Sequence, residues 1–325
     1  MSSGVAVTEP ATGTRDTDVP ALEFDGLTKS FGEHIAVDDL TFSVPRGSIC
    51  GFLGPNGAGK TTTIGMALGL VPPTSGTARV LGWDVRTHWG QVLQNVGAMV
   101  ERPAFYPYLS GRMNLEIFAR QAGIDDSGRI NEIVELVGMG ERADAKFGGY
   151  STGMKQRIGI AAAIICDPEV IILDEPTSGL DPAGQREIRH LIRRLSSTGH
   201  TVFVSSHILS EIQEVCTDVA IIARGKLVAH GRMDEILAGT DQLLIEVDRP
   251  DEARQALTQR SDLESAEIEN GWVVVEAPRE NSADINRYLV QSGFAVSQLR
   301  HREAQLEERF LELTGQPSGS EGEDG

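Results

Sequence analysis

The sequence is poor in cysteine, and it lacks the long apolar segment that a membrane-spanning helix requires. Its three cysteines, Cys50, Cys166 and Cys216, lie far apart in apolar surroundings, so we expect three buried free thiols, as in a reducing cytoplasm. The longest apolar run of interest, residues 158–166, has nine residues and includes Gly159. A membrane-spanning helix needs about 20 residues. The chain is therefore not expected to cross a membrane by itself.

Basic residues are scarce as well. The chain has 29 lysines and arginines against 47 acidic residues, which gives a formal charge of −18. This charge disfavours binding to the phosphate backbone of a nucleic acid as the main function. Only five of the basic residues are lysines, so a lysine within a motif is unusually informative. Residues 1–20 lack the basic start and apolar centre of a secretion signal, and their composition predicts a flexible tail.

Short apolar strands alternate with helical segments through the centre of the chain. Strands are expected at 48–53, 170–173 and 201–204, and helices at 60–70 and 182–196. This alternation predicts an α/β fold with a mostly parallel sheet that helices cover on both faces.

Two other regions flank or interrupt this pattern. Residues 22–44 have a strand-like pattern that ends in a turn at 45–47, and residues 102–165 have a helical pattern of apolar residues. We therefore expect a β region at the N-terminal end of the sheet domain and a helical subdomain within it.

The character of the sequence changes near residue 240. Residues 241–325 contain 19 acidic and eight basic residues, a net charge of −11, whereas the first 240 residues carry −7. Their pattern predicts the order strand, helix, strand, strand, helix, strand, which matches a ferredoxin-like α+β unit. The expected segments are 243–247, 251–259, 266–269, 272–276, 282–292 and 296–300, with a last helix at 303–313.

A glycine-rich loop lies between an expected strand and an expected helix. Residues 54–61 read GPNGAGKT, which fits the G-x-x-x-x-G-K-[ST] pattern of a P-loop. In such a loop, backbone N–H groups at a helix N-terminus surround phosphates, and glycine lets the backbone approach closely. Lys60 would place its charge on the β- and γ-phosphates, and Thr61 would offer a hydroxyl to Mg²⁺. The loop predicts a nucleoside triphosphate site.

Two acidic residues end the strand expected at 170–173. Acids at the carboxyl end of a parallel strand point into the ligand crevice of an α/β fold. Asp174 would hold Mg²⁺ through its water shell, and Glu175 would polarise the attacking water. The simpler interpretation is that both acids cap the next turn, but the P-loop with Lys60 and Thr61 favours the catalytic one.

A third motif lies between the P-loop and the acids. Residues 150–157 read YSTGMKQR, and Ser151 is a good N-cap for the helix that follows. This segment resembles the signature of the ABC ATPase family, which is usually written with two glycines and a glutamine. Thr152 and Met154 are departures from that form.

Three more residues extend the resemblance, which covers about residues 22–240. Asp181, in the sequence SGLD, resembles the end of the family's D-loop, and His207 resembles its switch histidine. Phe31 resembles the aromatic residue that stacks on adenine. Each has a structural alternative, since Asp181 and His207 could cap helices and Phe31 could belong to the core. The order of the whole set is what favours the ABC interpretation.

The resemblance implies a P-loop ABC ATPase fold with a RecA-like core sheet, an N-terminal antiparallel β region and a helical subdomain. It implies that two chains meet head to tail and enclose ATP. Ser151 and Gly153 would then act on the γ-phosphate in the other chain's site, and His207 would act within its own. One copy of each motif implies a homodimer with no nucleic acid partner.

The implied boundaries are flexible tails at 1–20 and 316–325, an ABC ATPase domain at 21–240 with its helical subdomain at about 102–165, and an accessory domain at 241–315. The implied catalytic residues are Lys60, Glu175 and His207, and the implied metal ligands are Thr61, Asp174 and Glu101. The implied ATP-binding residues are Phe31, Gly54, Pro55, Asn56, Gly57, Ala58, Gly59, Lys60, Thr61, Thr62, Ser151, Gly153 and Asp181.

Glu101 occupies the position of the glutamine in the family's Q-loop. A carboxylate there adds negative charge beside Mg²⁺ and donates no hydrogen bond unless it is protonated. Glu101, the YSTGMKQR segment and the chain end at 305–315 resemble the bacitracin- and lantibiotic-type exporter ATPases of bacteria. The implied function is ATP hydrolysis that powers drug export at the cytoplasmic face of the membrane.

Such an exporter has a separate membrane permease, which would rest a short helix in a groove beside the Q-loop. Phe105, Tyr106, Tyr108 and Leu109 are candidates for this groove, although they could instead pack within the helical subdomain. Two other functions stay open: an importer ATPase whose C-terminal domain senses a ligand, and a soluble ABC protein that acts on ribosomes or DNA.

Overall fold

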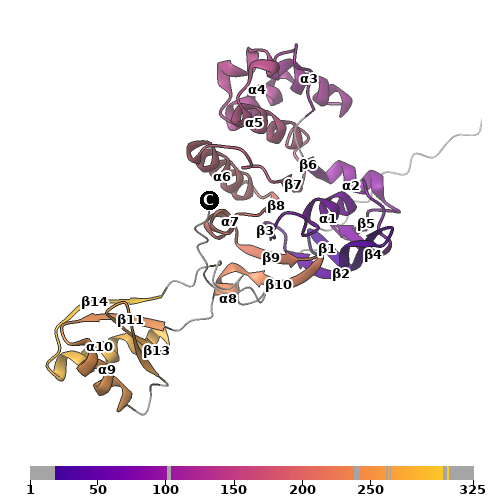
Figure 1. Ribbon diagram of the computed structural model, residues 1–325. Coiled ribbons are helices and arrows are strands. Elements are labelled where there is room, and N and C mark those ends of the chain that lie inside the picture. The colour runs from indigo at the N-terminus through magenta and orange to yellow at the C-terminus, as the bar shows by residue number, and fades with distance from the viewer. Residues whose placement is uncertain are drawn as a thin grey trace, which may run out of the picture. The chain divides into compact units, whose positions relative to one another are not determined.

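The computed structural model describes residues 19–100, 104–237, 242–260, 263, 265–302 and 306. The chain divides into two compact units, Met1–His230 and Gly231–Gly325, which are described separately (Figure 1). Glu101 lies outside the described residues, as do the two predicted tails except residues 19 and 20, and the helix predicted at 303–313 except Leu306. Within the described part, no helix combines the length and apolar character needed to span a membrane.

The N-terminal part of the first unit is an antiparallel sheet. Its strands pair in the order β2-β1-β4-β5. This sheet confirms the antiparallel β region predicted for this end of the chain. The strands are β1 (Leu22–Phe31), β2 (His34–Val44), β4 (Ser75–Val80) and β5 (Trp83–Asp84).

A six-stranded sheet forms the centre of the first unit, in the order β10-β9-β3-β8-β7-β6. The pairs from β9 to β6 are all parallel. Because β8 lies between β3 and β7, the carboxyl ends of these three strands meet at one edge of the sheet. The strands are β3 (Ile49–Leu53), β6 (Val96–Met99), β7 (Val170–Asp174), β8 (Thr201–Ser206), β9 (Asp218–Ala223) and β10 (Lys226–Arg232).

Helices cover both faces of this parallel sheet. Helix α1 (Lys60–Ala67) packs between the two sheets, and α6 (Pro182–Ser197) and α7 (Leu209–Val215) pack on the opposite face. Four buried phenylalanines join the sheets, with ring centroids 5.8 Å apart between Phe42 and Phe52 and 5.3 Å apart between Phe52 and Phe203. This apolar core holds the carboxyl edge of the parallel sheet in place.

Helices also fill the segment between β6 and β7, as predicted. Their N-caps are Ser110, Asp126 and Ser151, each of which accepts a hydrogen bond from a backbone N–H of the first turn. The helices are α3 (Gly111–Gln121), α4 (Ser127–Leu136) and α5 (Thr152–Ala163), while α2 (Trp89–Asn95) precedes β6.

The aromatic residues at the start of this helical region face two ways. Phe105 is half-buried, and its ring lies 5.1 Å from that of Phe118 and 5.0 Å from that of Phe147. Tyr106 and Tyr108 are exposed. Phe105 therefore belongs to the packing of the helical region, and the two tyrosines present their rings to solvent.

In its described residues, the second unit has a four-stranded antiparallel sheet with helices α9 and α10, preceded by the short helix α8. The strand order β12-β13-β11-β14 and the chain order β-α-β-β-α-β confirm the ferredoxin-like prediction. Helices α9 and α10 pack on the sheet through a separate apolar core of buried aliphatic residues. The elements are α8 (Met233–Leu237), β11 (Gln242–Val247), α9 (Pro250–Thr258), β12 (Ala266–Glu269), β13 (Trp272–Glu276), α10 (Ser282–Gln291) and β14 (Val296–His301).

Two local predictions were wrong. Helix α1 ends at Ala67 and not at residue 70, because Gly69 takes a left-handed conformation (φ +69°) that turns the chain before Pro72. Cys166 is exposed, because the run of buried residues that precedes it ends at Ile165. Cys50 and Cys216 are buried free thiols as predicted, and burial raises the pKa of both.

We expect a chain truncated after residue 240 to keep a cooperative thermal transition. The two apolar cores share no residue, because one uses residues between Ala21 and Ile222 and the other begins at Leu243. The unfolding midpoint of the first unit should change by less than about 4 °C. Circular dichroism during heating measures this midpoint. A broad transition without a folded-state baseline would contradict the division of the chain into two independently folded units.

Candidate functional site

The loop between β3 and α1 lies directly against the backbone of strands β2 and β9. Gly59 is the N-cap of α1, with φ +106°, and a Cβ atom there would lie 2.5 Å from the Ala36 carbonyl oxygen. At Gly54 a Cβ atom would lie 2.3 Å from the Ile222 carbonyl oxygen. Only glycine fits both positions. The backbone N–H groups of this loop precede the first turn of α1, where no intrahelical acceptor is available to them.

Lys60 is buried under this loop, with only 5% of its residue surface exposed. Its ammonium group donates to the carbonyl oxygens of Gly54 (2.7 Å) and Pro55 (3.2 Å), and lies 3.3 Å from Glu175 Oε1. A buried ammonium requires such partners, because desolvation of an unpaired charge costs several kcal/mol. Lys60 therefore places a fixed positive charge at the floor of the loop.

The side chains of Thr61 and Asp174 meet beside Lys60. The Thr61 hydroxyl donates to Asp174 Oδ2 at 2.9 Å. Asp174 is buried at the end of β7, and its other oxygen accepts a hydrogen bond from Ser205 Oγ on β8. A hydroxyl and a carboxylate side by side form a hard-oxygen donor set that suits Mg²⁺, which takes few protein ligands and keeps water or phosphate oxygens.

Glu175 lies between Lys60 and His207. One carboxylate oxygen is 3.3 Å from Lys60 Nζ, and the other is 3.3 Å from His207 Nδ1. The backbone of Glu175 has φ +47°, a left-handed conformation that residues other than glycine and asparagine seldom adopt. Its N–H donates to Ser205 Oγ at 2.9 Å. This bond and the flanking Lys60 and His207 side chains hold Glu175 at the mouth of the loop.

Ser205 was not predicted from the sequence. Its hydroxyl donates to Asp174 and accepts from the Glu175 N–H, so it orients both acids at once. The available signal was its place beside Ser206 at the end of the strand before His207. Strand pairing sets Ser205 opposite Asp174, and pairing partners cannot be read from one sequence.

Glu211 is a second residue that the sequence analysis missed. Its buried carboxylate accepts hydrogen bonds from Thr177 (2.7 Å) and Ser206 (3.1 Å). Thr177 follows Glu175 by two residues, and Ser206 precedes His207. Glu211 thus ties together the two segments that carry the catalytic candidates.

A cavity of about 320 Å³ opens above the loop. It brings together eight of the predicted residues, and it adds His34 and Ala36, which were not predicted. Phe31 is 52% exposed at its rim, so it is not a core residue. The cavity is lined by Phe31, His34, Ala36, Asn56, Gly57, Gly59, Lys60, Thr61, Thr62 and Glu175. Asp174 and His207 join this group through Thr61 and Glu175.

The predicted residues Gly54, Pro55 and Ala58 belong to the loop but are not among those that line the cavity. Ser151, Gly153 and Asp181 do not line it either. Ser151 caps α5 by accepting from the Met154 N–H (3.3 Å), and Asp181 caps α6 by accepting from the Gly184 N–H (3.0 Å). Burial raises the pKa of the Tyr150 phenol, which precedes Ser151 and donates to the Arg142 carbonyl oxygen. Ser151 and Asp181 therefore each cap the N-terminus of a helix outside the cavity lining.

The geometry defines a class of protein. A strand, a glycine-rich loop with a buried lysine, and an acid pair at the carboxyl end of another parallel strand of the same sheet are the parts of a P-loop nucleoside triphosphatase.

Comparisons with known proteins agree with this class and narrow it. The ABC transporter family matches residues 37–178. An uncharacterized ABC transporter ATP-binding protein of Bacillus subtilis is 40% identical over 297 residues, which cover 91% of this chain and 96% of that protein. The bacitracin transport ATP-binding protein BcrA of Bacillus licheniformis is 39% identical, with 89% and 95% covered.

Similarity extends to an exporter and to a solved structure. The Nod factor export ATP-binding protein I of Ralstonia nicotianae is 32% identical over 91% of this chain and 94% of its own length. A structure of the ATP-binding subunit of an ABC transporter superposes with a TM-score of 0.61 at 27% identity, covering 67% of this chain and 92% of that one. The chain belongs to the family of ABC transporter ATP-binding proteins. It is the ATP-binding, ATP-hydrolysing subunit of a transporter.

We expect Ser205→Ala to lower the free energy of unfolding by about 1–3 kcal/mol, because it leaves a buried acceptor on Asp174 and the Glu175 N–H without their partner. Urea titration followed by tryptophan fluorescence measures the change. Ser197→Ala is the matched control, since the Ser197 hydroxyl makes one exposed bond to the Arg194 carbonyl oxygen, and its effect should stay within about 0.5 kcal/mol. Equal effects would contradict the structural role of Ser205.

Proposed function

We propose that this chain drives export of a drug or peptide antibiotic from a bacterial cell through a separate membrane permease. The observation that carries the catalytic part is the position of Glu175, which lies between the Lys60 ammonium group of the P-loop and the imidazole ring of His207. The direction of transport is supported by relatives described as bacitracin transport and Nod factor export proteins, which this chain matches over almost its whole length.

In the proposed reaction, the adenine of ATP stacks on Phe31 and its phosphates lie along residues 54–62. Lys60 exchanges its contact with Glu175 for the β- and γ-phosphates, while its ammonium group keeps its hydrogen bonds to the Gly54 and Pro55 carbonyl oxygens. Glu175 then accepts a hydrogen bond from the attacking water, and His207 orients Glu175 and contacts the γ-phosphate.

Thr61 and Asp174 would hold Mg²⁺ at the phosphates. Their oxygen atoms are adjacent and come from a rigid helix start and a rigid strand end, which is the donor chemistry that Mg²⁺ requires. When bound, Mg²⁺ neutralises phosphate charge. The protein's own contribution is to orient Asp174 through Ser205 and to keep Glu175 apart from it, so that one acid faces the metal and the other faces water.

A second copy of the chain would complete the site. The N-termini of α5 and α6, with Ser151, Gly153 and Asp181, would meet the γ-phosphate held by the first copy. A helix N-terminus carries a partial positive charge, and its free N–H groups suit an anion. The sandwich would therefore form with ATP and open after hydrolysis.

The permease would dock on the helical region at the cytoplasmic face of the membrane. The exposed rings of Tyr106 and Tyr108 are the proposed contacts, since tyrosine is common at protein interfaces. The C-terminal ferredoxin-like unit contains none of the proposed catalytic residues, so we assign it to regulation or dimer contacts.

We expect Glu175→Gln to bind ATP and Mg²⁺ normally and to lose hydrolysis by about 10²–10⁴-fold, because the amide keeps the shape but not the charge of the base. The variant should accumulate as an ATP-bound dimer. Single-turnover kinetics and size exclusion with ATP measure both effects, with Lys60→Ala as the variant that fails to bind. Deep loss in Glu101→Gln together with an active, monomeric Glu175→Gln would assign the base to Glu101.

The export proposal predicts a membrane partner. The tagged chain should co-purify from detergent-solubilised membranes with an integral protein of several spans, and peptide antibiotics should stimulate the ATPase activity of that complex. Lys60→Ala should keep the complex and lose the stimulated activity. Recovery of a solute-binding protein in the same complex would favour import and contradict the proposal.

A further inference from the structure

Helices α5 and α6 begin side by side. A methyl group at Gly153, near the start of α5, would lie 3.7 Å from Leu180 Cδ2, which precedes α6. A methyl group at Gly179 would lie 3.9 Å from Thr152 Cγ2. The two N-termini proposed to meet a second copy thus lie next to each other. Whatever sets the relative position of α5 and α6 also sets the surface that the second copy receives.

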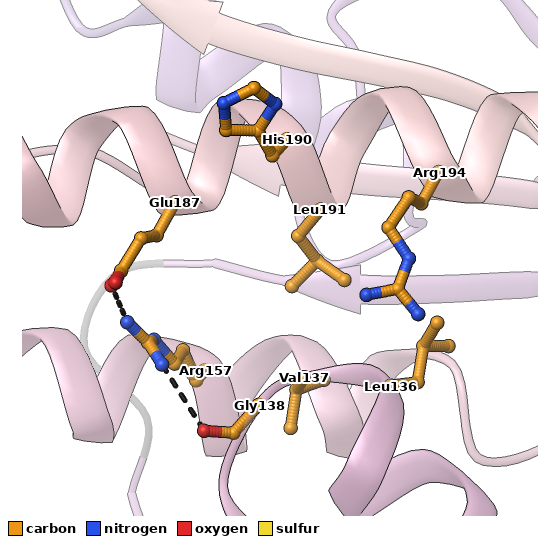
Figure 2. Close-up of a pocket in the computed structure, with 8 residues that line it drawn as sticks. All are labelled: Leu136, Val137, Gly138, Arg157, Glu187, His190, Leu191 and Arg194. Carbon is orange, nitrogen blue, oxygen red and sulfur yellow. Dashed lines mark hydrogen bonds and ion pairs between the residues drawn. The ribbon is translucent and has the colours of Figure 1, made fainter.

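One ion pair joins the two helices further along (Figure 2). Arg157 on α5 pairs with Glu187 on α6, and it also donates to the Gly138 carbonyl oxygen, 3.2 Å away, just after α4. Each partner lies six residues beyond its helix cap, as the differences 157 − 151 and 187 − 181 show. Arg157 therefore connects the helical region to α6 at the same distance, between one and two turns, beyond both caps.

At the level of this ion pair, apolar side chains do not fill the space between α5 and α6. A cavity of about 240 Å³ separates the end of α4 and α5 from α6, and the side chains of Leu191 and Arg194 point toward it from α6. Among the ion pairs of the described residues, Arg157–Glu187 is the one that links α5 to α6. Since side chains do not fill the space, a helix shift here would meet little steric resistance.

We propose that Arg157 and Glu187 are positioning residues that hold the start of α5 in register with the start of α6, and thereby set how tightly ATP joins two copies of the chain. This inference rests on the proposed ATP sandwich. Without the pair, α5 samples several positions relative to α6. Only a fraction of the chains then holds both helix N-termini in the arrangement that the second copy binds. The apparent dissociation constant of the dimer rises as that fraction falls.

The size of the effect follows from the exposure of the pair. Arg157 is 22% exposed and Glu187 is 58% exposed, and an exposed ion pair shifts an equilibrium by about 2–5-fold. The sandwich contains two such pairs, so its dissociation constant should rise by about 4–25-fold. Folding and ATP binding by the single chain should change little, because neither residue lines the nucleotide cavity.

The test uses the full chain carrying Glu175→Gln, which is expected to hold the ATP dimer. Sedimentation with ATP and Mg²⁺ gives the dimer dissociation constant for Glu187→Gln, for Arg157→Gln and for both together. A fluorescent ATP analogue at low protein concentration gives the affinity of the single chain. Glu214→Gln is the matched control, because Glu214 pairs with Arg189 and Arg193 of α6 at similar exposure but lies on α7.

The proposal is supported if each single substitution raises the dimer dissociation constant by about 4–25-fold and the double variant raises it no further. The affinity of the single chain for ATP, and the dimer dissociation constant of Glu214→Gln, should both stay within twofold of the parent values. A double-mutant cycle of this kind isolates the pair from other effects of each change. If Glu187→Gln leaves the dimer dissociation constant unchanged, or if the effects of the two single substitutions simply add in the double variant, the proposed role of the pair is wrong while the ATP sandwich stands. Absence of an ATP-driven dimer in Glu175→Gln itself would remove the proposed function and this inference with it.

Discussion

The buried ammonium group of Lys60 is the constraint on which the rest of the site depends. It draws two backbone carbonyl oxygens of its own loop and the Glu175 carboxylate around one positive charge. This arrangement requires a loop that lies against the backbone of strands β2 and β9, which only glycine permits at positions 54 and 59. It also requires an acid at the end of another parallel strand of the sheet. The order of the parallel strands, with β8 between β3 and β7, meets that requirement.

Two adjacent acids acquire different roles through their surroundings. Asp174 is buried and accepts from two hydroxyls, which leaves it beside Thr61 as an oxygen donor for a metal. Glu175 turns away through its left-handed backbone and is more exposed, between a lysine and a histidine. Ser205 forms hydrogen bonds with both acids. It therefore links the acid proposed to hold the metal to the acid proposed to activate water. In the proposed mechanism, phosphate binding and hydrolysis are linked through strand β8, which His207 follows directly.

Much of this site could be predicted because its motifs are local. The P-loop, the caps at Ser151 and Asp181 and the acids after β7 each depend on residues that are neighbours in sequence, and the structure places them on the expected elements. One prediction failed where burial decides the outcome, since Cys166 has apolar neighbours in sequence but lies at the surface. For Phe105 the sequence left two alternatives, and the structure shows it packed against Phe118 and Phe147.

The sequence by itself determined the class of the protein, since backbone N–H groups at a glycine-rich helix start and a lysine beside them bind phosphate in any fold that presents them. Tertiary structure alone decided which distant groups support that loop. Ser205, Glu211 and the Arg157–Glu187 pair contact partners between five and 34 residues away through strand pairing and helix packing. Such contacts depend on strand order and on relative helix position, which arise from the packing of the whole core and leave no short-range pattern in the chain.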